Sequence, residues 1–436
     1  MKLGFINFGG PAGQIALMHQ ELVERRRWLS DARFMHALNY CMLLPGPEAQ
    51  QLAVYVGWLL HRTLGGLVAG SLFVLPGALL MLGLSWAYAV HGSVPWVAAI
   101  FFGLRASVVA IVAAAVIRLG SRALRHPALA SIAALAFAGI FLLRAPFPLL
   151  VLGAGLVGLI GGRLAPGVFR PPAHAPAASG EAAIHGDDAD APEHARPTFR
   201  RSAGVIAVGL AAWWGPLALL MVWRGPEDVL SRQATFFSGA AMVTFGGAYA
   251  VLAYIQQAAV ERYGWLLPGQ MLDGLGLAET TPGPLILVTQ FVGFLGAYRN
   301  PGDLDPVVAG ILGAAVTTWA TFAPCFLWIF LGAPYIERLR GNRALGAALA
   351  AVTAAIVGVV LNLAVTFGLR ALFATVHEVA AGPVHLLVPE LRSIDLWAAA
   401  IAVVAFVGMR YRRWEVLPVV LGCAVAGVAI QLIARG

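Results

Sequence analysis

Two short motifs rich in glycine and proline occur twice in this chain, in the same order and at the same spacing. Phe8-Gly9-Gly10-Pro11 is followed by Pro45-Gly46-Pro47-Glu48, and Phe245-Gly246-Gly247-Ala248 is followed by Pro282-Gly283-Pro284-Leu285, the first residues of the motifs lying 37 positions apart in both cases. Equal spacing without a gap indicates an internal duplication. Because glycine adds backbone freedom and proline removes a hydrogen-bond donor, we expect a broken helix at each motif.

The chain around these motifs is too apolar for a soluble domain. Hydrophobic residues make up 60% of it and charged residues 11%, whereas about 25% of the residues of a soluble domain are charged. We therefore predict an all-α polytopic membrane protein. In a bilayer, backbone groups stay unpaired only where they line a cavity or bind a ligand, so broken helices at corresponding places in two repeats point to a substrate site.

Apolar stretches of about 20 residues, the length needed to cross a bilayer, divide the chain into two transmembrane repeats. We predict an N-terminal repeat over residues 1–165, a flexible cytoplasmic linker over 166–202, and a C-terminal repeat over 203–436 with one extra leading span. The linker is rich in Pro, Ala, His, Asp and Glu and cannot fold by apolar burial. The predicted spans number about six plus seven: Leu3–Met18, Phe34–Leu60, Leu64–Val90, Val94–Leu119, Leu129–Leu143, Phe147–Leu164, Val205–Trp223, Thr235–Ile255, Leu266–Tyr298, Val307–Ile336, Ala344–Phe373, Leu396–Val407 and Val416–Ile433.

Arginine-rich and arginine-poor loops alternate, and the alternation is opposite in the two halves. The loop at His91 is poor, whereas its counterpart in the second half contains Arg338, Arg340 and Arg343. Since positive charge favours cytoplasmic loops, we predict inverted-topology repeats with the N-terminus inside and the C-terminus outside. The loop at Arg25–Arg27 disagrees and fits an interfacial or re-entrant segment. Orientation also accounts for the net charge of +8, so we expect no nucleic-acid partner.

Cysteine and histidine spacings give no sign of a metal site or a redox centre. Cys41, Cys325 and Cys423 stand alone in apolar segments, so we expect neither a disulfide nor a bound cofactor. The linker histidines His174, His185 and His194 are irregularly spaced among acidic residues, which favours a solvated charged segment over a metal site. We expect no cleavable signal peptide, because the first motif begins at Phe8.

The motif residues resemble those of the chromate ion transporter family in its long form, which has two fused halves. The resemblance rests on Phe-Gly-Gly-Pro-Ala-Gly-Gln and Pro-Gly-Pro-Glu-Ala-Gln-Gln-Leu-Ala in the first half and on Thr-Phe-Gly-Gly-Ala-Tyr and Thr-Thr-Pro-Gly-Pro in the second, and it covers the chain apart from the linker. It implies a secondary transporter, not an enzyme, that exports chromate across the bacterial inner (plasma) membrane, is driven by the proton motive force and gives chromate resistance. Sulfate would be a competitor. One departure is the short segment before the first motif, where family members carry an amphipathic arm.

Two alternatives to chromate export remain from the sequence. The first is a carrier of sulfate or another tetrahedral oxyanion. The second is a membrane-embedded enzyme that reduces chromate or acts on a lipid, although the sequence contains no nucleotide-binding fingerprint and no cysteine redox pair. The sequence leaves open whether the protein is a monomer or a homodimer in the lipid bilayer.

A tetrahedral dianion requires several converging donors, and the helix N-termini at the breaks offer unpaired N–H groups and partial positive charge. The alternative is that the glycines only permit close helix packing. The predicted substrate-binding residues are those of the breaks with nearby polar side chains: Gly9, Gly10, Gln14, Pro45, Gly46, Pro47, Gln51, Arg105, Gly246, Gly247, Tyr249, Thr281, Pro282, Gly283 and Pro284.

Charged residues in or beside the apolar segments are candidates for proton coupling or gating. Glu48 follows the first Pro-Gly-Pro and either couples proton movement to anion release, lies at a water-exposed surface, or caps the following helix. Glu279 is the corresponding carboxylate of the second copy. Arg105 neutralises the dianion, pairs with a buried carboxylate such as Glu48, or extends to the membrane surface.

One charged pair occurs in both copies, at Glu24-Arg25 and at Glu261-Arg262. Each pair either gates the end of its helix, by pairing internally or with a neighbouring loop, or anchors that end at the membrane interface beside Trp28 or Trp265.

Overall fold

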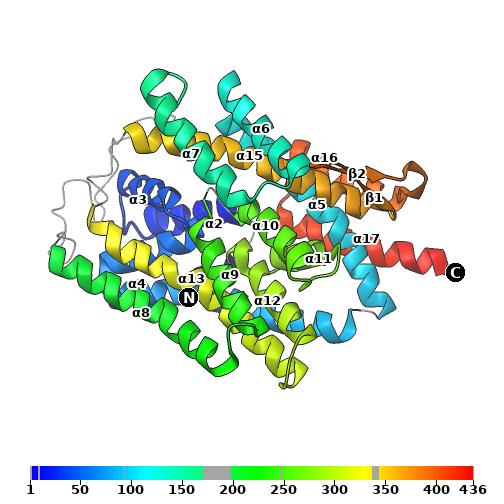
Figure 1. Ribbon diagram of the computed structural model, residues 1–436, viewed down its shortest axis with the longest axis horizontal. Helices are drawn as coiled ribbons and strands as arrows, with labels where there is room; N and C mark the ends of the chain where they lie inside the picture. The colour runs from blue at the N-terminus through cyan, green and yellow to red at the C-terminus, as the bar shows by residue number, and fades with distance from the viewer. Residues whose placement is uncertain are drawn as a thin grey trace. The chain divides into compact units, whose positions relative to one another are not determined.

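The computed structural model describes residues 2–7, 10–92, 94–169, 198–245, 248–335 and 343–435, and most of them are helical (Figure 1). The α-helices are α1 Lys2–Ile6, α2 Gly10–His19, α3 Asp31–Leu43, α4 Glu48–His91, α5 Pro95–Ala123, α6 Pro127–Leu143, α7 Phe147–Leu164, α8 Phe199–Arg224, α9 Val229–Met242, α10 Ala248–Gln257, α11 Gln270–Thr280, α12 Val288–Arg299, α13 Pro306–Gly332, α15 Arg343–Leu372, α16 Leu396–Tyr411 and α17 Val416–Arg435. Two π-helical turns, η1 Gln20–Arg25 and η3 Ala258–Arg262, and three short 3-10 turns, η4 Leu285–Leu287, η5 Ala333–Tyr335 and η6 Leu391–Ser393, complete the helical structure.

Seven of the described helices are long and apolar enough to cross a membrane, and three shorter helices are also apolar. The predicted class, an all-α polytopic membrane protein, is therefore confirmed. The stretches predicted to be broken do contain helix ends: α3 stops before Pro45 and α4 begins after Pro47, while α11 stops before Pro282 and η4 follows Pro284. The total of about thirteen crossings and the inverted orientation of the repeats stay predictions.

Local backbone geometry repeats between the two copies. The π-helical turns η1 and η3 follow α2 and α10, and both are followed by a residue with positive φ, Arg27 at +52° and Gly264 at +64°. These two residues are 237 positions apart, as are Gly46 and Gly283. The duplication read from the motifs thus extends to the helices between them.

Helix α4 is two helices joined by a sharp reversal. His61 and Arg62 have non-helical backbone angles, with φ of +57° at Arg62. On either side of the reversal, a Cβ atom added at Gly57 would come within 2.3 Å of the Gly65 carbonyl oxygen. Only glycine permits this close approach, and the reversal falls where the sequence predicts a boundary between Leu60 and Leu64.

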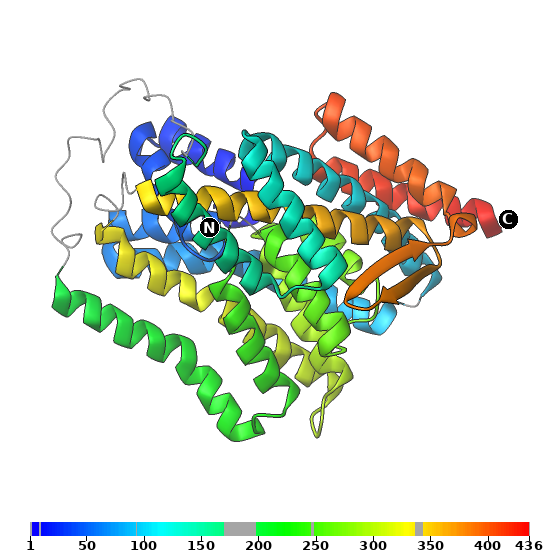
Figure 2. The ribbon, with the colours of Figure 1, turned by 45° about the horizontal axis from the view of Figure 1, so that its top comes forward.

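The described residues belong to two compact units. Unit 1 is Met1–Leu82, Pro172–Gly247 and Thr281–Asn342, and unit 2 is Gly83–Pro171, Ala248–Thr280 and Arg343–Gly436. Each unit thus takes segments from both predicted repeats, whose boundaries at residues 165 and 203 stay predictions. In unit 1, α13 packs against α8, α9 and α12 (Figure 1). In unit 2, α15 packs against α5, α6, α7 and α10, and α5 packs against α11, α16 and α17 (Figure 2).

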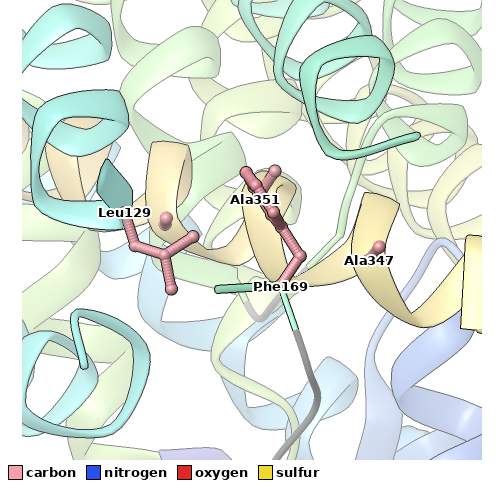
Figure 3. Packing of buried hydrophobic residues seen from close by; sticks show 5 residues of the cluster. Leu129, Phe169, Ala347 and Ala351 are labelled. Carbon is pink, nitrogen blue, oxygen red and sulfur yellow. The ribbon is translucent and has the colours of Figure 1, made fainter. Parts of the chain in front are cut away.

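Small residues allow the helices of unit 2 to approach closely. A Cβ atom added at Gly158 of α7 would lie 2.5 Å from the carbonyl oxygen of Ala347 on α15. Beside this contact, Leu129, Phe169, Ala347 and Ala351 form one buried cluster (Figure 3). Contacts between small residues at a helix crossing are the usual way in which membrane helices associate.

A β-hairpin in unit 2 was not predicted. Strands β1 Val376–Ala381 and β2 Val384–Pro389 pair antiparallel (Figure 2). Gly382 in the two-residue turn has φ of +61°. A glycine with positive φ suits the turns that connect such strands. Strand β2 packs against α6 and α15, so the hairpin lies over the ends of unit 2 helices.

Candidate functional site

The two Pro-Gly-Pro breaks have similar backbone geometry and make equivalent hydrogen bonds in unit 1. Gly46 has φ of +127° and Gly283 has φ of +112°. The Gly46 N–H donates to the Thr244 carbonyl at 2.7 Å, and the Gly283 N–H donates to the Asn7 carbonyl at 3.0 Å. Thr244 and Asn7 directly precede the Phe-Gly-Gly motifs. Each Pro-Gly-Pro break is therefore bonded to the residue before the Phe-Gly-Gly motif of the other copy.

Glycine is required at both breaks for its conformation, and at Gly46 also for space. A Cβ atom added at Gly46 would lie 2.7 Å from Cys325 Sγ and 2.7 Å from Gln51 Nε2. At Gly283 the nearest atom would be Leu287 Cδ1, at 3.0 Å. Positive φ strains residues that carry a Cβ, so the motifs identify positions that alanine cannot fill without strain.

Glutamine side chains support the backbone of the breaks. Gln14 Nε2 donates to the Gly283 carbonyl at 2.6 Å, and Gln51 Nε2 donates to the Pro45 carbonyl at 2.8 Å. Both glutamines are predicted site residues. Each glutamine donates a hydrogen bond to a carbonyl group of a Pro-Gly-Pro break, so these side chains stabilise the conformation of the breaks.

Two amide side chains in unit 1 are buried without hydrogen-bond partners. Asn7 is 1% exposed and Gln50 is 0% exposed, and neither the nitrogen nor the oxygen of either side-chain amide has a partner among the described residues. Leaving such a group unsatisfied costs about 1–3 kcal/mol. Asn7 was not among the predicted site residues, although its position directly before the first Phe-Gly-Gly could have indicated it.

Helix N-termini follow both Pro-Gly-Pro breaks. Helix α4 begins at Glu48, and η4 begins at Leu285 and continues into α12. The first N–H groups of a helix have no partner within it and attract anions. Glu48 lies in the first turn of α4, a position that suits a helix-capping role, while Leu285 offers no charge at the equivalent position. The proton-coupling role of Glu48 stays a prediction.

In unit 2, Arg105 pairs with a carboxylate that the sequence analysis missed. Arg105 Nε and Nη2 donate to Asp273 Oδ1 and Oδ2 at 2.6 and 2.8 Å. Asp273 is 0% exposed and also accepts a hydrogen bond from the Tyr88 hydroxyl at 2.7 Å. Its signal was an acidic residue inside an apolar helix, which is costly in a membrane unless paired. The partner named at the sequence level was Glu48; the described partner is Asp273.

Tyr249 and Glu279, both predicted site residues, are joined in unit 2. The Tyr249 hydroxyl donates to Glu279 Oε1 at 2.7 Å, and the Glu279 side chain is buried. The carboxylate of the second copy therefore lies beside a neutral donor.

The two repeated Glu-Arg pairs have different surroundings. In the first copy, Glu24 contacts His19 at 3.3 Å and Arg25 contacts Glu21 at 3.4 Å. In the second copy, Glu261 lies 3.7 Å from Arg144, and Arg262 lies over the Tyr263 ring. The gating and anchoring roles of the two pairs stay predictions.

The predicted residues divide between the two units. Those described in unit 1 are Gly10, Gln14, Glu24, Arg25, Pro45, Gly46, Pro47, Glu48, Gln51, Thr281, Pro282, Gly283 and Pro284, and those in unit 2 are Arg105, Tyr249, Glu261, Arg262 and Glu279. Gly9, Gly246, Gly247 and the linker histidines lie outside the described residues. Within the described residues, no group of three potential metal ligands occurs.

Comparisons with known proteins place these motifs in one family. The model of the family described as "Chromate transporter" matches residues 1–159 and 232–428. A probable chromate transport protein of Synechococcus elongatus is 30% identical over 85% of this chain and 84% of its own length. Chromate transport proteins of Cupriavidus metallidurans and Pseudomonas aeruginosa are 29% and 33% identical, over 85% and 83% of this chain and 82% and 77% of their own lengths. No solved structure matches. With the family model covering both halves, this multi-pass membrane protein belongs to the chromate transporter family.

Proposed function

We propose that this protein transports chromate out of the bacterial cytoplasm across the inner membrane, driven by the proton motive force, and thereby gives chromate resistance. Membership of the chromate transporter family and the names of three similar relatives support chromate as the substrate. Export and proton coupling are proposals that fit an anion with two negative charges, because the membrane potential, negative inside, favours its exit.

The observation that carries the proposal is the pair of equivalent hydrogen bonds at the Pro-Gly-Pro breaks, from Gly46 to Thr244 and from Gly283 to Asn7. These bonds hold both breaks in unit 1, where helix N-termini and buried amide groups are available as donors. Neutral donors and helix dipoles stabilise an anion without the cost of a permanently buried cation. The arrangement suits a tetrahedral dianion that must bind and then leave.

Chromate uptake by inverted membrane vesicles tests the proposal. Vesicles that contain the wild-type protein should accumulate chromate when a proton gradient is imposed, and a protonophore should abolish the accumulation. Gly46→Ala and Gly283→Ala should each lose most of this uptake, because a Cβ is strained at both positions. Gly83→Ala, at an open position in α4, is the matched control. Normal uptake by both break variants at equal expression would contradict the proposed site.

Proton coupling is tested separately at the two carboxylates. If Glu48 is the coupling group, Glu48→Gln should make the uptake rate independent of pH. Glu279→Gln keeps the hydrogen bond from Tyr249, because the glutamine carbonyl oxygen can still accept it, so loss of the pH dependence in this variant alone would assign the coupling to Glu279. Unchanged pH dependence in Glu48→Gln would leave Glu48 as a helix cap.

Sulfate transport is the second candidate function. The donors described in unit 1 are backbone N–H groups and neutral amides, and such donors recognise tetrahedral shape and charge rather than the central atom. Competition in the same vesicles separates the two: a chromate carrier should take up chromate in the presence of equal sulfate, whereas a sulfate carrier should not.

A further inference from the structure

Unit 2 contains a cavity of about 80 Å³ that the proposed transport site does not include. The cavity is lined by two arginines, Arg144 and Arg370, and by neutral donors on two helices, among them Gln256, Asn362 and Thr366. Two carboxylates, Glu261 and Glu378, and His385 also line it. A cavity with convergent polar groups is the usual form of a small-ligand site.

One face of α15 presents three donors to this cavity. Asn362, Thr366 and Arg370 are four residues apart along the helix, so they lie on the same side of it. Arg370 Nε is buried and has no hydrogen-bond partner, and Arg370 forms no ion pair with any described residue. Arg370 lies in the last turn of α15, where the negative end of the helix dipole favours a positive charge. This position does not explain a buried N–H group without an acceptor.

Arg144 lines the same cavity from the end of α6, and a ligand can displace the carboxylates that pair with it. Arg144 caps α6 in the left-handed conformation, with φ of +50°. Its guanidinium contacts Glu378 of β1 and lies 3.7 Å from Glu261. These side chains are partly exposed, and ion pairs of this kind contribute only about 0–1 kcal/mol. A dianion can therefore compete with the carboxylates for Arg144.

We propose that this cavity is a second binding site for a divalent tetrahedral oxyanion, in which Arg144 and Arg370 are the cationic donors and Glu378 is the carboxylate that the anion displaces. Guanidinium groups present planar forks of donors that match the oxygen atoms of such an anion. The formal charges of the two arginines and the two carboxylates cancel. Displacement of Glu378 from Arg144 by the anion would leave the positive charge of the arginines facing the anion. The inference goes beyond the proposed transport, because binding here does not require that any ion cross the membrane.

Equilibrium binding of labelled sulfate to the purified full-length protein in detergent tests the site. Glu378→Gln removes the competing charge and should tighten binding at least tenfold, a gain that misfolding cannot produce. Arg144→Gln and Arg370→Gln should each weaken binding at least tenfold. Arg392→Gln is the matched control, because Arg392 is exposed in the same segment of unit 2 and does not line the cavity. Chloride should not compete at equal concentration.

Labelling of a cysteine placed in the cavity lining tests whether sulfate binds in this cavity. Leu386 lines it from β2 and is 42% exposed, whereas the three native cysteines are buried. Sulfate should slow maleimide labelling of Leu386→Cys at least fivefold in an otherwise wild-type chain and should have no effect when Arg370→Gln is added. Equal affinities in Glu378→Gln and Arg392→Gln, or labelling that sulfate leaves unchanged, would overturn the proposal. Protection by anionic lipid alone would overturn it too, and would identify a lipid headgroup as the source of the oxyanion.

These outcomes are independent of transport. Failure of wild-type vesicles to accumulate chromate, with sulfate still protecting Leu386→Cys, would reject the proposed function and retain the second site. Normal chromate accumulation, with sulfate failing to slow labelling of Leu386→Cys, would retain the proposed function and reject the second site.

Discussion

The Pro-Gly-Pro breaks of unit 1 and the contact between α5 and α11 in unit 2 satisfy their buried polar groups in different ways. In unit 1, the Pro-Gly-Pro breaks are stabilised by backbone hydrogen bonds and by neutral amides such as Gln14 and Gln51. In unit 2, charged side chains are paired with one another, as in Arg105 with Asp273 and Arg144 with Glu378. The difference indicates separate roles: neutral donors at the breaks leave room for the charge of a substrate, whereas the Arg105–Asp273 pair fixes α5 to α11. The predictions below test this division.

The largest effect is expected where a buried charge in unit 2 loses its partner. Arg105→Gln leaves Asp273, which is 0% exposed, without its cationic partner. Breaking a buried ion pair from one side costs about 3–5 kcal/mol, and the lower end applies here because the Arg105 side chain is 43% exposed. The thermal midpoint of the purified protein in detergent should fall by several degrees.

The double variant Arg105→Gln with Asp273→Asn is the control for this pair. It removes both charges, keeps neutral hydrogen-bonding groups, and should recover part of the loss. If Arg105→Gln melts like the wild-type protein, the pair does not fix α5 to α11 and the contrast between the units fails.

The sequence allowed the Pro-Gly-Pro helix breaks to be predicted, but not which side chains distant in the chain pair with each other. Glycine and proline at fixed spacing located both Pro-Gly-Pro breaks, because these residues act on their own backbone. The Arg105 partner could not be located in this way, since Asp273 is far away in sequence and its proximity depends on how α11 packs on α5. Asp273 could still have been suspected from its place in an apolar helix. The roles of the predicted site residues stay predictions.

The β-hairpin was missed for a different reason. Its strands are six residues long each, and a search for stretches of about 20 apolar residues passes over such segments. The Gly382-Pro383 pair between two runs containing Val and Leu was the available signal, since Gly in a two-residue connection favours a hairpin. Arg144, Arg370 and His385 therefore could not be related to one another before the fold was known.

A second, smaller effect is expected at the breaks of unit 1. Both Gly46→Ala and Gly283→Ala should lose about 1–3 kcal/mol of stability, because alanine is strained at positive φ. Gly46→Ala should lose about 1 kcal/mol more, because its Cβ displaces Gln51 from the hydrogen bond to Pro45. Thermal midpoints of the two variants and of Gly83→Ala measure the difference. Equal losses of stability in the two variants would show that the Gln51 hydrogen bond does not stabilise the break at Gly46.

A third prediction concerns the unpaired amide of Gln50. Gln50→Met keeps the shape of the side chain and removes a buried polar group without a partner, so it should stabilise the protein by about 1–2 kcal/mol. Chromate uptake should fall several-fold if the amide serves the substrate. Gln233→Met should destabilise instead, because Gln233 Nε2 donates to the Gly293 carbonyl at 2.9 Å. A Gln50→Met protein that is more stable and fully active would remove Gln50 from the proposed site.

The smallest effect is expected at the hairpin ion pair of unit 2, and its sign depends on pH. Burial opposes ionisation of Glu378, but the hydrogen bond with His385 and the charge of Arg144 outweigh it and hold the pKa of Glu378 below its ordinary value of 4.5. A carboxyl whose pKa is lowered in the folded state stabilises that state above its ordinary pKa and loses this contribution as the pH falls through the folded-state pKa. Glu378 is partly exposed, so the contribution near neutral pH should be below about 1 kcal/mol. Glu378→Gln should therefore melt slightly below the wild-type protein near neutral pH, and the two midpoints should converge well below pH 4.5. A difference that grows on acidification would mean that Glu378 is not held as a carboxylate by Arg144, and the charge pairing assigned to unit 2 would not extend to its hairpin.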